Sequence, residues 1–292
     1  MRLQGPYFEG WYFKHRQGGR TAAFIPGYQI DRQGNGSAFI QVITDGWSGW
    51  AAFPLAELTL CRSPLCVRVS GSVFTERGMA VDFTADGVRV RGAVRYGPLT
   101  PPKGDVMGPF RVLPAMECRH GVVSLHHGLS GGVRVGGEIL RLDGGAGYIE
   151  TDRGRSFPKP YLWTQCSDFP SAGRAPCSIM VTAARIPYLG AEFPGCIASI
   201  YRDGRELRLA TYHGAKVAHC GPDGLLLRQG RWTLRVDIPE QYGGRTLRAP
   251  MNGGMSRRIR ESAACPARYR LYRDGNTVFD WRSNGASAEY EG

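Results

Sequence analysis

The sequence of 292 residues lacks any apolar run close to the length of about 20 residues that a membrane-spanning helix needs. Its N-terminus lacks the charged, apolar and small-residue sections of a secretory signal peptide. The eight cysteines are scattered and form no C-x-x-C pair. We therefore expect a cytoplasmic protein whose thiols are reduced, mostly buried and not needed for disulfides.

Several catalytic signatures are also missing. There is no G-x-S-x-G nucleophile elbow, no Walker loop, and no G-x-G-x-x-G placed between a strand and a helix. These absences argue against a nucleophile-elbow serine site, a P-loop phosphate site and a dinucleotide-binding site.

Lysine is scarce: only four of the 37 basic residues are Lys, so Arg carries almost all of the net charge of +12. Such a charge is compatible with nucleic acid, an anionic membrane surface or an acidic substrate. The densest cluster, SRRIRE from Ser256 to Glu261, is short and mixed in sign, and makes a poor phosphate-binding stripe. We predict no nucleic-acid partner. Contact with a membrane surface and the oligomeric state stay open.

Glycine and proline, by contrast, are abundant and punctuate short apolar runs. The 41 Gly and 19 Pro follow no fixed period, which indicates many turns between strands. The stretch TAAFIPGYQIDRQGNGSAFIQVIT has two apolar runs around a Gly/Asn-rich turn. Further hairpin turns are expected at the Asp-Gly pairs that begin at Asp86, Asp203, Asp223 and Asp274. The sequence therefore predicts successive antiparallel hairpins.

Many closely spaced antiparallel strands close into barrels or stack as sandwiches, because exposed edges are a liability. Pro/Gly-rich stretches interrupt the pattern at residues 96–110 and 141–148. The predicted fold is all-β, with two barrels or curved sheets packed together. The N-terminal domain covers 1–135 and the C-terminal domain covers 136–292. Single helical turns are expected only near Phe53 to Leu60 and Ser256 to Ala264.

The stretch PYFEGWYFK near the start places five aromatic rings around one carboxylate. In a strand, alternate side chains share a face, so each of three stretches sets rings beside polar groups. The three sets are Tyr7, Glu9, Trp11 and Phe13; Tyr148, Glu150 and Asp152; and Tyr161, Trp163, Gln165 and Phe169. A structural core prefers aliphatic residues, whereas a ligand cavity combines aromatic walls with a few placed polar groups. Packing at a barrel rim is the alternative for each ring.

The segment MECRHGVVSLHHG gathers Glu117, Cys118, His120, His126 and His127 within 11 residues. The spacing does not match a closed zinc site, and adjacent His126 and His127 point to opposite faces of a strand. Cys118 and His120 align as nucleophile and base only if the strand stays regular. We predict no bound metal, and interpret the histidines as hydrogen-bonded core groups or proton-transfer groups.

Longer motifs resemble those of the tocopherol cyclase family, specifically its uncharacterised bacterial members. They are YFEGWYFK near the start, MGPF and MECRHG in the middle, and GYIETDRGRSFPKPYLWTQ after them. LRAPMNGGMSRRIRES and the closing AEYEG follow in the same order. The resemblance runs from about Tyr7 to Glu291.

The resemblance implies two lipocalin-like antiparallel barrels, similar to those of carotenoid hydratase-like proteins, and neither a redox cofactor nor a metal. Plant members close the chromanol ring of vitamin E: a prenyl double bond is protonated and the neighbouring phenol oxygen captures the cation. Two positions depart from the family pattern, because Arg119 and Arg153 stand where aromatic residues are common. A lost ring changes the cavity, so the plant substrate itself is not implied.

Protonating an alkene requires an acid that stays protonated at neutral pH, and burial of a carboxyl group among rings achieves this by raising its pKa. The catalytic candidates are Glu9, Asp152, Glu117 and His120. The substrate-binding candidates are Trp11, Tyr12, His126, Glu150, Trp163 and Gln165. In these roles, the rings of Trp11, Tyr12 and Trp163 would stabilise the cation. His120 or His126 would accept the phenol proton, and Gln165 would orient the phenol.

Other interpretations stay open. Glu9 could form an ion pair with an Arg across the barrel floor, and Asp152 could pair with Arg153 or Arg155. The barrel could carry a hydrophobic ligand without reacting on it, or could let water capture the cation as a hydratase does. In each case the expected partner is a hydrophobic small molecule.

Overall fold

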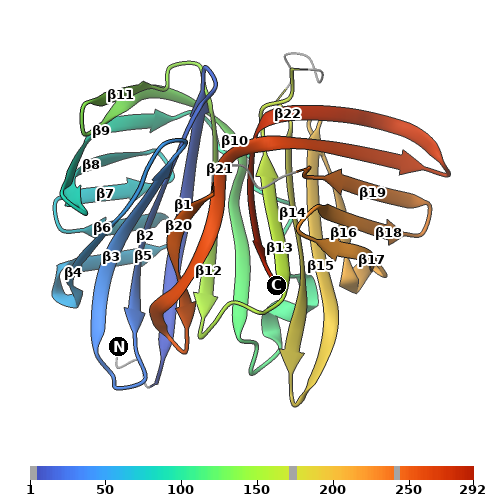
Figure 1. Ribbon diagram of the computed structural model, residues 1–292, viewed down its shortest axis with the longest axis horizontal. Helices are drawn as coiled ribbons and strands as arrows, with labels where there is room; N and C mark the ends of the chain where they lie inside the picture. The colour runs from blue at the N-terminus through green and yellow to red at the C-terminus, as the bar shows by residue number, and fades with distance from the viewer. Residues whose placement is uncertain (1–4, 171–175, 240–243) are drawn as a thin grey trace. The chain divides into compact units, whose positions relative to one another are not determined.

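The computed structural model describes residues 5–170, 176–239 and 244–292, whose regular secondary structure is almost entirely β-strand. Short 3-10 turns occur at η1 (Leu55–Glu57), η2 (Gly108–Val112) and η4 (Thr211–His213). Within these ranges, no helix combines the length and the apolar character that crossing a membrane demands. The prediction of an all-β protein built from two curved antiparallel sheets is confirmed (Figure 1).

The chain forms two compact units, each assembled from three segments. The first unit consists of Met1–Pro101, His120–Phe157 and Thr246–Arg258, and the second consists of Pro102–Arg119, Pro158–Arg245 and Ile259–Gly292. The predicted boundary near residue 136 falls in the turn between two paired strands, β10 and β11. The division into 1–135 and 136–292 stays a prediction.

The first sheet follows the order β4-β3-β2-β1-β12-β10-β9-β8-β7-β6-β5, and β11 pairs with β10. Its strands are β1 (Tyr7–Gln17), β2 (Arg20–Ile30), β3 (Gly36–Thr44), β4 (Ser48–Pro54), β5 (Leu58–Arg62), β6 (Leu65–Val69), β7 (Ser72–Thr75), β8 (Gly78–Ala85), β9 (Val88–Tyr96), β10 (Cys118–Val135), β11 (Glu138–Arg141) and β12 (Ala146–Gly154). In Figure 1 the long blue strands β1–β3 run across the direction of the short strands β6–β9, as in a strongly curved sheet.

The second sheet follows the order β16-β15-β14-β13-β22-β21-β19-β18-β17, and β20 pairs with β21. Its strands are β13 (Tyr161–Cys166), β14 (Ser178–Tyr188), β15 (Ala191–Arg202), β16 (Arg205–Ala210), β17 (Lys216–Gly221), β18 (Gly224–Gln229), β19 (Trp232–Asp237), β20 (Arg245–Met251), β21 (Gly254–Arg273) and β22 (Asn276–Glu291). Across the described ranges, neither sheet closes through hydrogen bonds into a complete barrel: β4 and β5 remain the ends of the first, β16 and β17 of the second.

Most of the predicted hairpins form. β2 and β3 pair around the Gly/Asn-rich turn, and Asp-Gly turns connect β8 to β9, β15 to β16 and β21 to β22. The turn expected at Asp223-Gly224 is shifted by one residue, because Gly221 pairs directly with Gly224. The helical turn expected near Ser256 to Ala264 is wrong: this segment lies within β21, since pairing with neighbouring strands overrides a weak local preference.

Each sheet encloses its own apolar core. Alternation places Met79, Val81 and Phe83 of β8 inside the first unit, where Phe13 and Phe24 are fully buried. The second core contains Tyr269, and the hydroxyl of Thr164 lies 2.6 Å from its phenol oxygen. Each core shows which face of a strand is internal. Side chains on the opposite face are outside the core and are the ones considered for a functional site.

Candidate functional site

The pairing of β1 with β12 sorts the residues of PYFEGWYFK onto two faces. Tyr12 lies opposite Glu150 and Gly10 lies opposite Asp152, and residues directly opposite each other share a face. Glu9, Trp11 and Phe13 point the other way, and the last two belong to the core of the first unit. The predicted alternation therefore holds, but Glu9 lies on the face opposite to that of Glu150 and Asp152. The face away from the core carries Tyr12, Lys14, Tyr148, Glu150 and Asp152.

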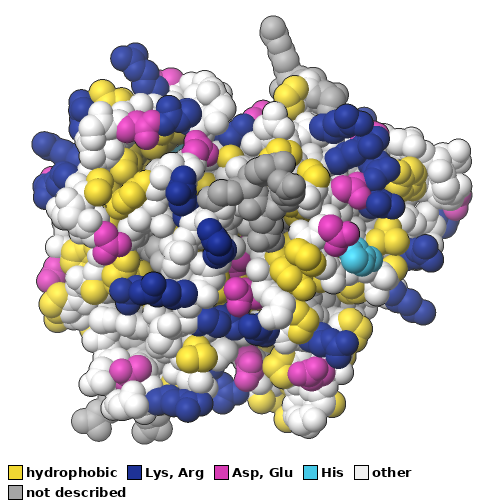
Figure 2. All heavy atoms as spheres, in the orientation of Figure 1, with side chains coloured by type: hydrophobic (Ala, Val, Ile, Leu, Met, Phe, Trp, Pro, Cys, Tyr) yellow, Lys and Arg dark blue, Asp and Glu magenta, His cyan; other side chains and the backbone are white. Residues whose placement is uncertain are grey.

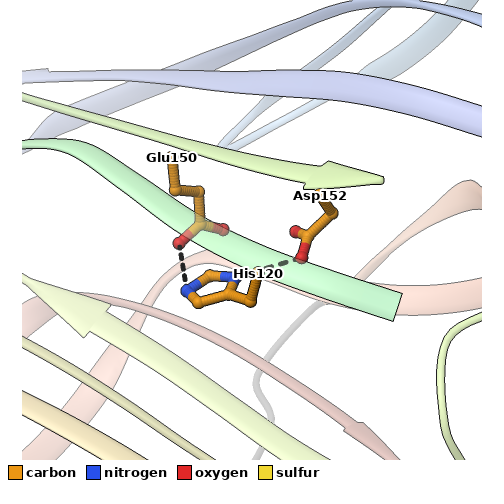
Figure 3. A group of neighbouring side chains, drawn as sticks. All are labelled: His120, Glu150 and Asp152. Carbon is orange, nitrogen blue, oxygen red and sulfur yellow. Dashed lines mark hydrogen bonds and ion pairs between the residues drawn. The ribbon is translucent and has the colours of Figure 1, made fainter. Parts of the chain in front are cut away.

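His120, from the neighbouring strand β10, brings this face a third titratable group. Its Nδ1 atom lies 3.0 Å from Oδ1 of Asp152, and its Nε2 atom lies 3.8 Å from Oε2 of Glu150. Figure 3 shows the imidazole ring between the two carboxylates, with one nitrogen directed at each. Asp152 accepting a hydrogen bond from Nδ1 leaves Nε2 as the nitrogen that faces Glu150. We call these three residues, together with Tyr148, the acid–base cluster.

Tyr148 completes the cluster from two residues before Glu150. Its hydroxyl donates a hydrogen bond of 2.5 Å to Oε2 of Glu150. Burial is the main cause that raises the pKa of Tyr148 well above its usual value, and the negative charges of Glu150 and Asp152 raise it further. Tyr148 therefore stays a phenol at neutral pH and holds the Glu150 carboxyl in place as a donor.

The cluster is suited to moving protons rather than to holding a metal ion. Its three possible ligand atoms lie within 4.8 Å of one another. The two nitrogens of His120 face different carboxylates, however, and an imidazole gives a metal ion only one of them. One imidazole between two carboxylates is an arrangement in which a proton can be passed between neighbouring sites. The absence of a metal stays a prediction.

Glu9 forms the ion pair that the sequence left open as an alternative to catalysis. Arg62, the last residue of β5, donates to Oε1 of Glu9 through Nε at 2.9 Å, and its terminal nitrogen contacts Oε2. The Tyr28 hydroxyl donates to Oε2 at 3.0 Å. Burial and the Glu9 charge raise the pKa of Tyr28. The sequence pattern identified neither partner. Tyr28 lies directly opposite Glu9 on the paired strand β2, whereas Arg62 comes from β5, at the far end of the sheet order.

Replacing Arg62 by Ala is expected to lower the free energy of unfolding by about 2 kcal/mol, because the buried Glu9 loses its cationic partner. The value is below that of a fully buried pair, since the Arg62 side chain is 44% exposed and solvent screens it. The Glu9 side chain is 2% exposed. Urea denaturation measures the change. The matched control is Arg89→Ala, which removes the exposed pair with Asp82 and should change stability by about 0.5 kcal/mol or less. Equal losses in the two variants would contradict a buried ion pair at Glu9.

The remaining candidates are spread over both units. Glu117 is half-buried in the bend before β10, and His126 is half-buried within it. Burial lowers the pKa of His126. Trp163 and Gln165 lie on β13 of the second unit, on the face opposite to its core residues Leu162 and Cys166. The Gln165 amide donates to the hydroxyls of Ser167 and Ser178, at 2.8 and 3.3 Å.

Arg119 and Arg153, the two positions where aromatic residues were expected from the sequence, have different surroundings. Arg153 is exposed and lies opposite Glu9, near the end of β12. Arg119 donates hydrogen bonds to the carbonyl oxygens of Arg111 and Leu113, at 3.3 and 2.9 Å. It therefore stabilises the turn η2. Asp152, for which Arg153 or Arg155 was the alternative partner, pairs with His120.

A second group of histidines lies inside the first unit. Nε2 of His15 is 2.7 Å from the hydroxyl of Tyr96, and the Tyr96 ring packs against the ring of His127 at 4.5 Å. Nδ1 of His127 is 3.0 Å from the Ser124 hydroxyl. Burial lowers the pKa of His15 and of His127 to about 3. His127 is thus a hydrogen-bonded core histidine, one of the two alternatives that the sequence left open.

Comparison with known proteins gives a family and a fold. A family model described as tocopherol cyclase-like matches residues 77–292. No curated protein matches the sequence. Kievitone hydratase from Nectria haematococca superimposes with a TM-score of 0.54 at 12% identity, over 98% of this chain and 89% of that one. CghA superimposes with a TM-score of 0.59 at 14% identity, over 98% and 88%. At these identities the two structures show a shared fold.

Proposed function

Because this chain belongs to the tocopherol cyclase-like family, we propose that it is a cofactor-independent cyclase of a hydrophobic, prenylated phenol or quinol. The observation that carries the proposal is the acid–base cluster. Glu150 and His120 lie beside each other, within a ring-lined face that includes Tyr12. A proton donor next to an aromatic ring is what the protonation of an alkene requires.

The proposed reaction is an isomerisation in which every proton is accounted for. The cluster gives its proton to one carbon of the prenyl double bond, and a carbocation forms on the other carbon. The phenol oxygen attacks that carbon and forms the C–O bond of the ring. The phenol proton then returns to the cluster, so the protein regains its starting state and no co-reactant is needed.

The chain's residues take distinct parts in this proposal. Glu150 and His120 hold the transferable proton, and Asp152 fixes the orientation of the His120 ring. Tyr148 positions the Glu150 carboxyl, and the Tyr12 ring, opposite Glu150, stabilises the cation. Trp163 and Gln165 stay predictions as substrate-binding residues.

Hydration is the second candidate function, and the exposure of the cluster favours it. The side chains of His120 and Asp152 are 14% and 24% exposed, so water reaches this group. Water that captures the cation gives an alcohol in place of a cyclic ether. One fold neighbour is itself named a hydratase.

Incubation of the purified protein with prenylated phenols and quinols tests the proposal, with products identified by mass spectrometry. A cyclic ether has the mass of its substrate but a different retention time, and an alcohol is heavier by one water. The ether supports the cyclase and the alcohol supports the hydratase. A ligand that binds in native mass spectrometry and is returned unchanged would make the protein a carrier.

A further inference from the structure

One hairpin turn of the second unit differs in residue type from the other left-handed Xaa-Gly turns of the described residues. The turn between β14 and β15 has Leu189 at φ +50° followed by Gly190 at φ +83°. Such left-handed pairs favour Asn, Asp or Gly at the first position. Among the described residues, five other Xaa-Gly turns have the same signs of φ, and their first residues are Gly18, Asp86, Asp203, Asn252 and Asp274. Leu189 is the apolar exception.

Neither backbone preference nor burial accounts for Leu189. A γ-branched apolar residue gains nothing from the left-handed conformation, unlike the short polar residues of the other turns. Packing of the side chain does not offset the cost of the left-handed backbone either, because Leu189 is 77% exposed. One exposed apolar side chain is ordinary on a protein surface, but several that gather at one place mark a contact site.

A second exposed apolar residue lies on a segment that packs against the same hairpin. Val112, at the end of η2, is 71% exposed. The ring of Phe110, two residues earlier, contacts the rings of Phe193 on β15 and Tyr212, with centroids 5.9 and 6.0 Å away. Arg119 stabilises this segment through hydrogen bonds to the carbonyl oxygens of Arg111 and Leu113. We define the apolar tip as Phe110, Val112, Ile186, Tyr188, Leu189 and Phe193.

The apolar tip is a projection and not a groove. Pairing with β13 ends at Ala184, and pairing with β16 begins at Ile197. The amides of Arg185 and Cys196 still donate to Pro160 and Thr211, so residues 186–195 of the hairpin extend beyond both neighbouring strands. Figure 2 shows hydrophobic side chains at the lower end of β14 and β15, with charged side chains directly above them.

Basic side chains stand behind the tip. Arg111 and Arg185 are exposed, and Glu192 lies 3.8 Å from Arg185. Glu192 offsets the charge of Arg185, so the exposed Arg111 is the cation beside the tip that matters for lipid contact. A projecting apolar tip with an arginine beside it matches a lipid surface, in which anionic headgroups cover hydrocarbon. A protein partner would instead need a groove that receives the tip.

We propose that the apolar tip docks the second unit onto an anionic lipid bilayer, with Leu189 and Val112 inserted at the boundary between headgroups and acyl chains. This goes beyond the proposed reaction and does not depend on it. In this orientation the exposed Arg111, next to Val112 in the sequence, would contact the lipid phosphates. The contact is shallow and reversible, since only a few apolar side chains enter the bilayer.

Co-sedimentation of the full chain with vesicles tests the proposal. The vesicles contain phosphatidylcholine with an equal part of phosphatidylglycerol, or phosphatidylcholine alone. The wild type should bind the mixed vesicles more strongly. Leu189→Asp and Val112→Ser should each weaken binding about tenfold, because each removes a large apolar contact. Arg111→Gln should weaken binding about fivefold on the mixed vesicles and have little effect on neutral ones.

Two controls keep the result interpretable. Leu189→Asp restores the residue type of the other turns, so its melting temperature should equal or exceed that of the wild type. Ile139→Ser removes an exposed apolar side chain of the first unit and should leave binding unchanged. No binding of the wild type to either vesicle would overturn the proposal. So would a wild-type dimer that Leu189→Asp converts to a monomer, which would make the tip an interface between copies.

Discussion

Replacing Glu150 by Gln is expected to lower turnover of a prenylated substrate by about 10²–10⁴-fold, the range that a positioned general acid contributes. The amide keeps the size of the side chain and can still accept the hydrogen bond from Tyr148, but it cannot pass a proton to or from His120. The loss should therefore appear in kcat rather than in substrate affinity. Product formation by Glu150→Gln, measured under single-turnover conditions, checks this.

Glu9→Gln is the matched control for this experiment. Glu9 is also a buried carboxylate of the same sheet, but it faces the opposite side and pairs with Arg62. Its replacement should lower stability while leaving kcat unchanged at a temperature where both variants are folded. Full activity in Glu150→Gln together with loss in Glu9→Gln would assign the proton donor to the other face and contradict the proposed cluster.

His120→Gln and Asp152→Asn separate two roles within the cluster. His120→Gln removes the group that exchanges a proton with Glu150 and should approach the loss seen in Glu150→Gln. Asp152→Asn leaves every proton-carrying group in place but no longer fixes Nδ1 as the protonated nitrogen of His120. Its loss should be smaller, and it should change the pH dependence of kcat.

As pH falls, the protein should begin to lose stability well above the pH range in which carboxylates become protonated. The reason is that two core histidines are neutral in the folded state. Burial lowers the pKa of His15 and of His127 to about 3, from a usual value near 6.5. Below about pH 6.5 the unfolded chain binds protons that the folded chain does not, so stability falls as pH falls. Between about pH 6.5 and 4.5, each histidine should lower the free energy of unfolding by about 2 kcal/mol.

Denaturant unfolding at a series of pH values measures this slope. His15→Gln and His127→Gln should each flatten it, whatever stability they lose at neutral pH with the bonds to Tyr96 and Ser124. His219→Gln is the control, because His219 is exposed beside Asp223. A slope that is the same in the wild type and in both core variants would mean that these histidines are protonated in the folded state.

Local sequence was sufficient for the all-β class and for most hairpins. An Asp-Gly pair between apolar runs acts over four residues, and such turns form wherever their flanking strands can pair. Alternation also assigned Glu150 and Asp152 to one face correctly, because side-chain direction in a strand depends only on parity. The segment from Ser256 to Ala264 shows the limit, since a preference for a helical turn was weaker than the pairing of β21 with its neighbours.

The candidate site needed the register of distant strands. His120 reaches Glu150 and Asp152 because β10 lies beside β12, and no local pattern states which strands are neighbours. The contacts of Arg62 with Glu9 and of His15 with Tyr96 likewise join strands that are far apart in the sequence. Composition and periodicity thus established an all-β chain with paired rings and carboxylates. Packing of each core then decided which face those groups occupy, because a face is internal only once another strand has covered it.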